Sequence, residues 1–220
     1  MDLPRCTGRI TFLNVSFAYD QRKPAIENLS FTAEPGTSVA IVGESGSGKS
    51  TCLKLLFRFY DVASGCIKLD NHDIRGLKLQ SARGHFGVVP QDTTLFNTSI
   101  LYNIKYAKPD ATLEEVYEAC RAANIHDKIL SFPEAYETMV GDRGLRLSGG
   151  EKQRVCNPFI ISTSCNYFNV NQVAIARAIL KSPQIILLDE ATASLDSHTE
   201  KQIQEALETV TMGRTTITIA

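Results

Sequence analysis

The chain has 220 residues with 23 basic and 24 acidic side chains, so it is long enough for one large domain, or one domain with a subdomain. Its net charge of −1 argues against a surface that coats nucleic acid and against a polybasic membrane patch. The sequence holds no apolar run near the roughly 18 residues that span a bilayer, no targeting signal, and six scattered cysteines without a Cys-x-x-Cys pair. We therefore expect reduced thiols in a cytosol-like compartment, and a membrane link only through a partner.

The N-terminal part predicts strands on either side of a glycine-rich loop. Apolar residues alternate from Arg9 to Tyr19, which indicates a strand with a bulge or break at Asn14. A second strand is expected over 28–33. The apolar run 39–42 predicts a buried strand directly before the loop, and 51–57 predicts a helix directly after it. Further short strands are expected over 65–70 and 85–89.

The loop between that strand and that helix matches Gly-x-x-x-x-Gly-Lys-[Ser/Thr], a pattern that binds phosphate. The matching residues are Gly43, Glu44, Ser45, Gly46, Ser47, Gly48, Lys49 and Ser50. Glycines allow successive backbone N–H groups to turn toward an anion, and the following helix contributes its positive end. Lys49 can reach the outer phosphates, and Ser50 can bind Mg²⁺. The sequence therefore predicts a nucleotide phosphate site here.

The middle of the chain interrupts this alternation of strands and helices. Thr112 and Glu115 form a capping-box pattern before a helix that continues to about Ala123, and a shorter helix is expected over 125–132. A Ser-Gly-Gly turn at 148–150 then leads into a polar helix. We expect a helical subdomain at about 98–155, inserted in an α/β core.

The C-terminal part predicts a buried strand that ends in two carboxylates, Asp189 and Glu190. An apolar strand buried on both faces is typical of a parallel sheet. Asp189, at the carboxyl end of this strand, lies where a nucleotide-associated Mg²⁺ would be held. Glu190 could polarise an attacking water. A helix capped at Ser197 and a strand from Thr215 complete the fold.

The order of these motifs resembles the nucleotide-binding domain of an ATP-binding cassette (ABC) transporter, over nearly the whole chain. The motifs are Tyr19, GESGSGKS (43–50), VVPQD with Gln91, LSGGEKQ (147–153), IILLDE (185–190) and SLD (194–196). LSGGEKQ separates this family from other phosphate-loop proteins. The segments 55–61, 87–97 and 140–150 resemble the subfamily B half-transporters of the mitochondrial and heavy-metal-tolerance group.

The resemblance implies an α/β fold of the P-loop NTPase class: an ABC-type ATPase head with a mainly parallel core sheet, an antiparallel β subdomain and a helical subdomain, over 9–220. It implies that Tyr19 stacks on adenine, although packing in the core is the alternative for an aromatic at a strand end. Residues 43–51, including Thr51, would wrap the phosphates of ATP, with Lys49 on the β- and γ-phosphates. Ser50, Gln91 and Asp189 would hold Mg²⁺, and Glu190 would be the general base, with Lys49 and Gln91 as further catalytic residues.

The resemblance also implies partners. Ser148, Gly149 and Gly150 would contact ATP held by a second nucleotide-binding domain, so the working unit would be a head-to-tail dimer. A transmembrane domain would precede Met1 and a histidine that contacts the γ-phosphate would follow Ala220. We expect a membrane-associated ATPase of the translocase class whose cassette faces the cytosol or the mitochondrial matrix. No nucleic acid is expected as a partner, and the transported substrate cannot be read from these residues.

One stretch departs from the family pattern. The family helix continues directly from the residues matching Arg154 to those matching Val173, so residues 155–172 are 172 − 154 = 18 extra residues. Asn157-Pro158 argues against a helical insert, since proline breaks helix interiors. We expect the helix to end near Arg154 and to restart near Val173. Residues 155–172 could be the product of a retained intron or a genuine surface loop, and the sequence leaves both explanations open. An alternative function follows, namely a fragment or regulatory module that binds ATP but hydrolyses it poorly.

Overall fold

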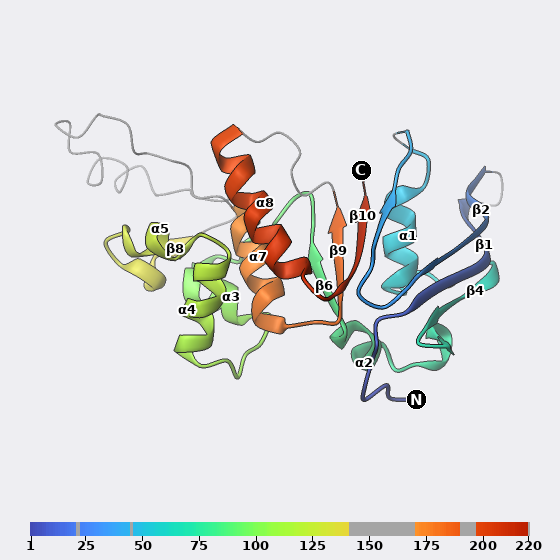
Figure 1. Cartoon of the computed structure of the whole chain (residues 1–220), viewed down its shortest axis with the longest axis horizontal. Coiled ribbons are helices and arrows are strands. Elements are labelled where there is room, and N and C mark those ends of the chain that lie inside the picture. Colours follow the sequence, from blue (N-terminus) through green and yellow to red (C-terminus); the bar gives the residue numbers. More distant parts are fainter. Residues whose placement is uncertain (21–22, 45, 141–169, 190–196, 220) are drawn as a thin grey trace. The chain divides into compact units, whose positions relative to one another are not determined.

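The computed structural model describes residues 1–220 except 21–22, 45, 141–169, 190–196 and 220. The chain forms two compact units. The first consists of residues 1–91, 182–195 and 208–220, and the second of residues 92–181 and 196–207. Both contain helices and strands (Figure 1).

An antiparallel sheet forms one part of the first unit, in the strand order β2-β1-β4-β5. These strands are β1 (Ile10–Asp20), β2 (Lys23–Ala33), β4 (Ser64–Leu69) and β5 (His72–Asp73). The register of β1 shifts on both of its sides next to Asn14, whose φ is +47°. The predicted irregularity at Asn14 is therefore confirmed, and asparagine suits it because its side chain tolerates the left-handed region. The second predicted strand begins earlier than expected, at Lys23.

Gly65 makes this bulge possible. Its φ is +76°, and a Cβ at this position would lie 2.3 Å from the carbonyl oxygens of both Leu13 and Asn14. We expect Gly65→Ala to lower the free energy of unfolding by about 2 to 4 kcal/mol, because it adds a backbone clash to left-handed strain. Gly84→Ala is the matched control, since nothing lies within 4 Å of its Cβ position. Urea unfolding measures both, and an equal loss in the two variants would contradict this account.

A parallel sheet forms the other part of the first unit, in the order β3-β10-β9-β6. The strands are β3 (Ser38–Ile41), β6 (Phe86–Val89), β9 (Ile185–Asp189) and β10 (Thr215–Ile219), and all neighbouring pairs are parallel. The predicted parallel core and antiparallel β subdomain are both confirmed. Apolar residues of both sheets and of α1 (Lys49–Leu56) belong to one core cluster, which includes Phe12, Leu55, Ile67 and Ile217. This shared core fixes the position of the antiparallel sheet relative to the loop that precedes α1.

Three shorter features complete the description of the first unit. Residues Ile74–Gly76 form the 3₁₀ helix η1, and Leu79–Gly84 form α2. The N-terminal residues run alongside them, where the backbone N–H of Leu3 donates to Ser81 at 2.8 Å. The sequence patterns did not predict β5, η1 or α2.

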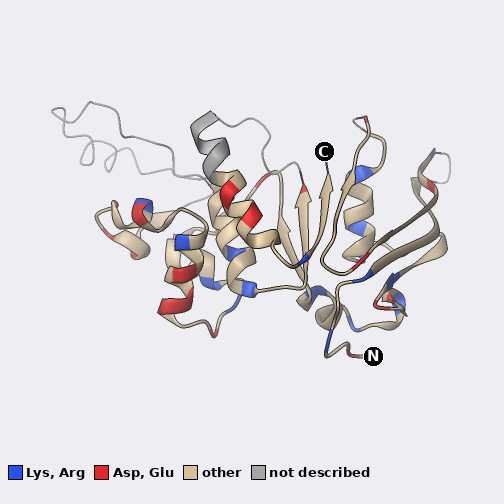
Figure 2. Ribbon diagram, in the orientation of Figure 1, with Lys and Arg blue, Asp and Glu red and all other residues tan. Residues whose placement is uncertain are grey.

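The second unit is mainly helical. It contains α3 (Ile100–Lys105), α4 (Leu113–Ala122), α5 (His126–Leu130), the 3₁₀ helix η2 (Ala135–Glu137), α7 (Val170–Lys181) and the antiparallel pair β7 (Thr98–Ser99) and β8 (Met139–Val140). The helix α8 (Ser197–Thr211) begins in this unit and ends in the first. The predicted capping box is confirmed: Thr112 accepts from the N–H of Glu115 at 3.2 Å, and Glu115 accepts from that of Thr112 at 2.7 Å. Figure 2 shows the acidic residues at the start of α4, where their negative charge interacts favourably with the positive end of the helix dipole.

The helix α7 is anchored in the second unit by polar side chains as well as by apolar packing. Arg177 donates to the carbonyl oxygen of Asn103 at 2.7 Å and to its side-chain oxygen at 2.8 Å. Gln172, which is buried, donates to the carbonyl oxygen of Asn124 at 3.1 Å. The helix begins at Val170, three residues before the expected restart, and so takes in the end of the predicted insert. The remainder of that insert, 155–169, lies outside the described residues. Among the residues that are described, no helix is both long and apolar enough to cross a bilayer.

Candidate nucleotide-binding site

The glycine-rich loop lies between β3 and α1, as its sequence predicts. Gly46 and Gly48 have φ values of +83° and +93°, and Gly48 is the N-cap of α1. A Cβ on Gly48 would lie 2.3 Å from the carbonyl oxygen of Ala25 in β2. Only glycine therefore suits this position, and the loop packs closely against the antiparallel sheet. Within the loop, the N–H of Ser47 donates to the carbonyl oxygen of Glu44 at 3.1 Å.

The lysine of the loop is half-buried, and its side chain donates hydrogen bonds to the loop itself. The Nζ of Lys49 donates to the carbonyl oxygens of Gly43 at 2.5 Å and Glu44 at 3.3 Å. These two acceptors hold the ammonium group over the loop, next to the positive end of α1. A phosphate bound there would replace carbonyl dipoles with a full negative charge as the partner of Lys49.

The helix α1 places three further side chains behind the loop. Ser50 is exposed, whereas Thr51 and Cys52 are buried. Burial raises the pKa of the Cys52 thiol to about 11, so this thiol is protonated near neutral pH and unsuited to nucleophilic chemistry. Cys52 therefore serves as a small apolar residue that packs under the loop.

The carboxyl ends of the parallel strands bring other predicted residues to the same sheet edge as the loop. Asp189 ends β9 and pairs with Ile219 of β10, which in turn pairs with Ile41 at the end of β3. On the other side of β9, Val89 at the end of β6 pairs with Leu188. Gln91 follows two residues after β6, so it leaves the sheet at this edge too. Ligands of open parallel sheets bind outside this edge.

Tyr19 lies at the end of β1 and belongs to a cluster of side chains beside α1. Its hydroxyl lies 3.3 Å from the hydroxyl of Thr51, and the Nζ of Lys54 lies 5.6 Å from its ring centroid. The residue is 51% exposed, so Tyr19 does not belong to the core and its ring remains available to a base. Thr51 lies two residues after Lys49 in α1, so this contact brings Tyr19 close to the start of that helix.

Five predicted site residues lie outside the described part of the chain: Ser45, Ser148, Gly149, Gly150 and Glu190. Two other residues of the site were not predicted. Lys54 and Tyr60 both contact the Tyr19 ring, and Tyr60 does so edge-on with ring centroids 5.2 Å apart. The only sequence signal was the spacing of Lys54, which lies on α1 five residues after Lys49. The contact of Tyr60 depends on the fold of the loop that follows α1.

Comparison with known proteins places this site in a family. The model of the family described as "ABC transporter" matches residues 26–164. The chain is 63% identical over 220 residues to the ABC transporter aclQ of Aspergillus oryzae, covering 100% of this chain and 25% of that protein. It is 56% identical over 219 residues to the heavy metal tolerance protein of Schizosaccharomyces pombe, covering 100% and 24%. It is also 54% identical over 213 residues to ATP-binding cassette sub-family B member 6 of Mus musculus, covering 97% and 23%.

A solved structure agrees with these relatives. The chain is 44% identical to a bacterial Atm1-family ABC exporter, solved with ATP bound, and superimposes on it with a TM-score of 0.81. The match covers 100% of this chain and 36% of that one. The chain thus spans about a quarter of the length of the curated relatives it matches. The family model, the relatives and the fold agree that the chain belongs to the ABC transporter family, as a nucleotide-binding domain of the subfamily B half-transporter group.

Proposed function

We propose that this chain binds ATP together with Mg²⁺ and hydrolyses it, and that hydrolysis drives export through a membrane-spanning partner domain. The observation that carries the proposal is the shared sheet edge. The glycine-rich loop with Lys49, the carboxylate of Asp189 and the amide of Gln91 all leave the parallel sheet at its carboxyl ends. Phosphoryl transfer requires this combination of an anion cradle and groups that neutralise charge.

The residues present fit Mg²⁺. Ser50, Gln91 and Asp189 offer a hydroxyl, an amide oxygen and a carboxylate, and oxygen ligands are what this ion prefers. Mg²⁺ would neutralise charge on the β- and γ-phosphates when bound. Lys49 would hold those phosphates, and Tyr19 would stack on the base. Glu190 would accept the proton of the attacking water.

The proposal extends to partners and location. A second nucleotide-binding domain would supply its residues 148–150 to the ATP held here, and this chain would return the same contact. A transmembrane domain would attach the pair to a membrane, with the cassette facing the cytosol or the mitochondrial matrix. The likeness to a bacterial Atm1-family ABC exporter supports an export role, and specificity would be set outside this chain.

Release of inorganic phosphate from ATP by the 220-residue chain tests the proposed activity. We expect turnover that requires Mg²⁺, stops with EDTA and exceeds that of Glu190→Gln, which removes the base and retains the size of the side chain. Turnover should rise more steeply than in proportion to chain concentration, because two copies complete each site. Turnover no higher than that of Glu190→Gln, in a chain that still binds ATP, would instead identify a binding module without hydrolysis.

A further inference from the structure

The loop between α1 and β4, residues 57–63, packs against the Tyr19 side chain. Tyr60 in this loop meets the Tyr19 ring edge-on, with centroids 5.2 Å apart and an interplanar angle of 89°. Phe17 of β1 contacts both rings, at 4.9 Å from Tyr19 and 5.4 Å from Tyr60. The three rings therefore form one cluster, and edge-to-face geometry is favourable for aromatic pairs.

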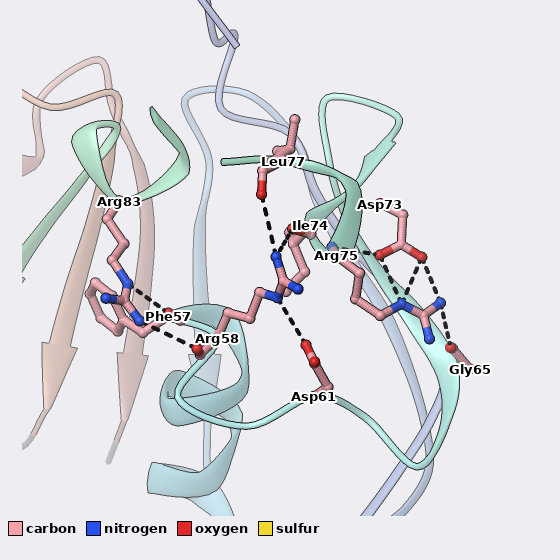
Figure 3. Close-up of polar contacts among 9 residues, drawn as sticks. All are labelled: Phe57, Arg58, Asp61, Gly65, Asp73, Ile74, Arg75, Leu77 and Arg83. Carbon is pink, nitrogen blue, oxygen red and sulfur yellow. Dashed lines mark hydrogen bonds and ion pairs between the residues drawn. The ribbon is translucent and has the colours of Figure 1, made fainter. Parts of the chain in front are cut away.

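This loop is fixed from several sides. Figure 3 shows two arginines that hold its backbone and its turn. Arg83 of α2 donates to the carbonyl oxygens of Phe57 at 2.9 Å and Arg58 at 3.3 Å. Arg58 donates to the carbonyl oxygens of Ile74 and Leu77, both at 3.3 Å, and pairs with Asp61 at 2.9 Å.

Two backbone hydrogen bonds join the same loop to α1 and to β1. The N–H of Phe59 donates to the carbonyl oxygen of Lys54 in α1 at 2.9 Å. The N–H of Ala63 donates to the carbonyl oxygen of Ser16 in β1 at 3.0 Å. The loop is thus tied to the helix that follows the phosphate loop and to the strand that carries Tyr19. Tyr60 therefore lies in a loop whose backbone is held at several points, although the residue itself is 45% exposed.

We propose that Tyr60 is a positioning residue for base recognition, which holds the Tyr19 ring in the orientation that stacks on the base of ATP. The inference rests on the proposed function. A half-exposed tyrosine at the end of a strand would otherwise lose rotamer freedom when the base binds, and that loss weakens binding. Contacts with Tyr60, Phe17 and the Thr51 hydroxyl restrict the ring before the base arrives. Tyr60 acts through Tyr19 and needs no contact with nucleotide.

The test compares ATP with inorganic tripolyphosphate, which has the phosphates but no base. We expect Tyr60→Leu to weaken ATP binding by about 3- to 10-fold, the size of an aromatic pair contribution, and to leave tripolyphosphate affinity unchanged. Leucine keeps apolar bulk, which protects the fold. Tyr60→Phe should restore ATP affinity, because the contact is made by the ring. Tyr102→Ala, at a tyrosine of similar exposure in the second unit, is the control and should change neither affinity.

A double variant decides whether the effect passes through Tyr19. If it does, Tyr19→Ala combined with Tyr60→Leu should bind ATP as weakly as Tyr19→Ala alone. Additive losses, or a parallel loss of tripolyphosphate affinity in Tyr60→Leu, would overturn the role of Tyr60 and leave the nucleotide site intact. A folded wild-type chain that binds neither ATP nor tripolyphosphate would overturn the nucleotide site itself, and with it this inference.

Discussion

Gly48→Ala is expected to weaken ATP binding by about 100-fold, the effect of losing one or two charge-assisted hydrogen bonds between the loop and phosphate at about 1.5 to 3 kcal/mol each. The new Cβ would lie 2.3 Å from the carbonyl oxygen of Ala25 and 3.3 Å from the side chain of Ile26, both in β2. Because the clash is with a backbone atom, either the loop or the strand must shift to relieve it. The left-handed φ of +93° adds strain of about 1 to 2 kcal/mol. Equilibrium titration with ATP measures the loss, and urea unfolding measures the cost to the fold.

Gly213→Ala separates strain from the clash. Gly213 also has a positive φ, of +70°, but no atom lies within 4 Å of its Cβ position. This variant should therefore lower stability by about 1 to 2 kcal/mol and leave ATP affinity unchanged. If Gly48→Ala bound ATP as well as Gly213→Ala does, close packing of the loop on β2 would not matter for the site.

Lys49→Ala is expected to lower ATP affinity by about 100-fold with little change in stability. Charge-assisted bonds to the β- and γ-phosphates contribute about 1.5 to 3 kcal/mol each, and every 1.4 kcal/mol is tenfold in affinity. The present partners of Lys49 are exposed carbonyl oxygens of Gly43 and Glu44, which water can satisfy once the ammonium is gone. Unfolding in urea should therefore shift by less than about 1 kcal/mol.

Lys78→Ala is the control for Lys49→Ala. Its side chain is 66% exposed and pairs with Asp2 at 2.7 Å, so it removes one surface charge remote from the glycine-rich loop in the sequence. A surface ion pair contributes about 0 to 1 kcal/mol, and ATP affinity should not change. Equal losses of ATP affinity in the two lysine variants would mean that net charge, rather than the position of Lys49, governs binding.

The sequence predicted the parts of the fold whose signals are local. The strand-loop-helix unit around Gly43 to Ser50, the irregularity at Asn14 and the capping box at Thr112 all depend on residues close together in the chain. The hairpin between β4 and β5 was missed for a local reason too. Asp70 and Asn71 both have positive φ, +47° and +69°. Positive φ at both central residues is typical of the two-residue hairpin turns whose twist matches that of the flanking strands. Glycine is the usual second residue of such turns, and its absence at Asn71 hid the signal.

The surroundings of the Tyr19 ring could not be predicted in this way. Tyr60 lies 60 − 19 = 41 residues after Tyr19, and the two rings meet only because a loop is held by Arg58 and Arg83. Each of those arginines donates to backbone carbonyl oxygens, which carry no side-chain signature. The pairing of Asp189 with the end of β10 is also a matter of sheet order rather than of sequence spacing.

The most direct test of the account is a titration of the wild-type chain and Lys49→Ala with ATP in the presence of Mg²⁺. Isothermal titration calorimetry gives both the affinity and the number of sites. We expect saturable binding of one ATP per wild-type chain, and binding at least about 100-fold weaker in Lys49→Ala. A folded wild-type chain that gave no saturable binding, or the same isotherm as Lys49→Ala, would contradict it.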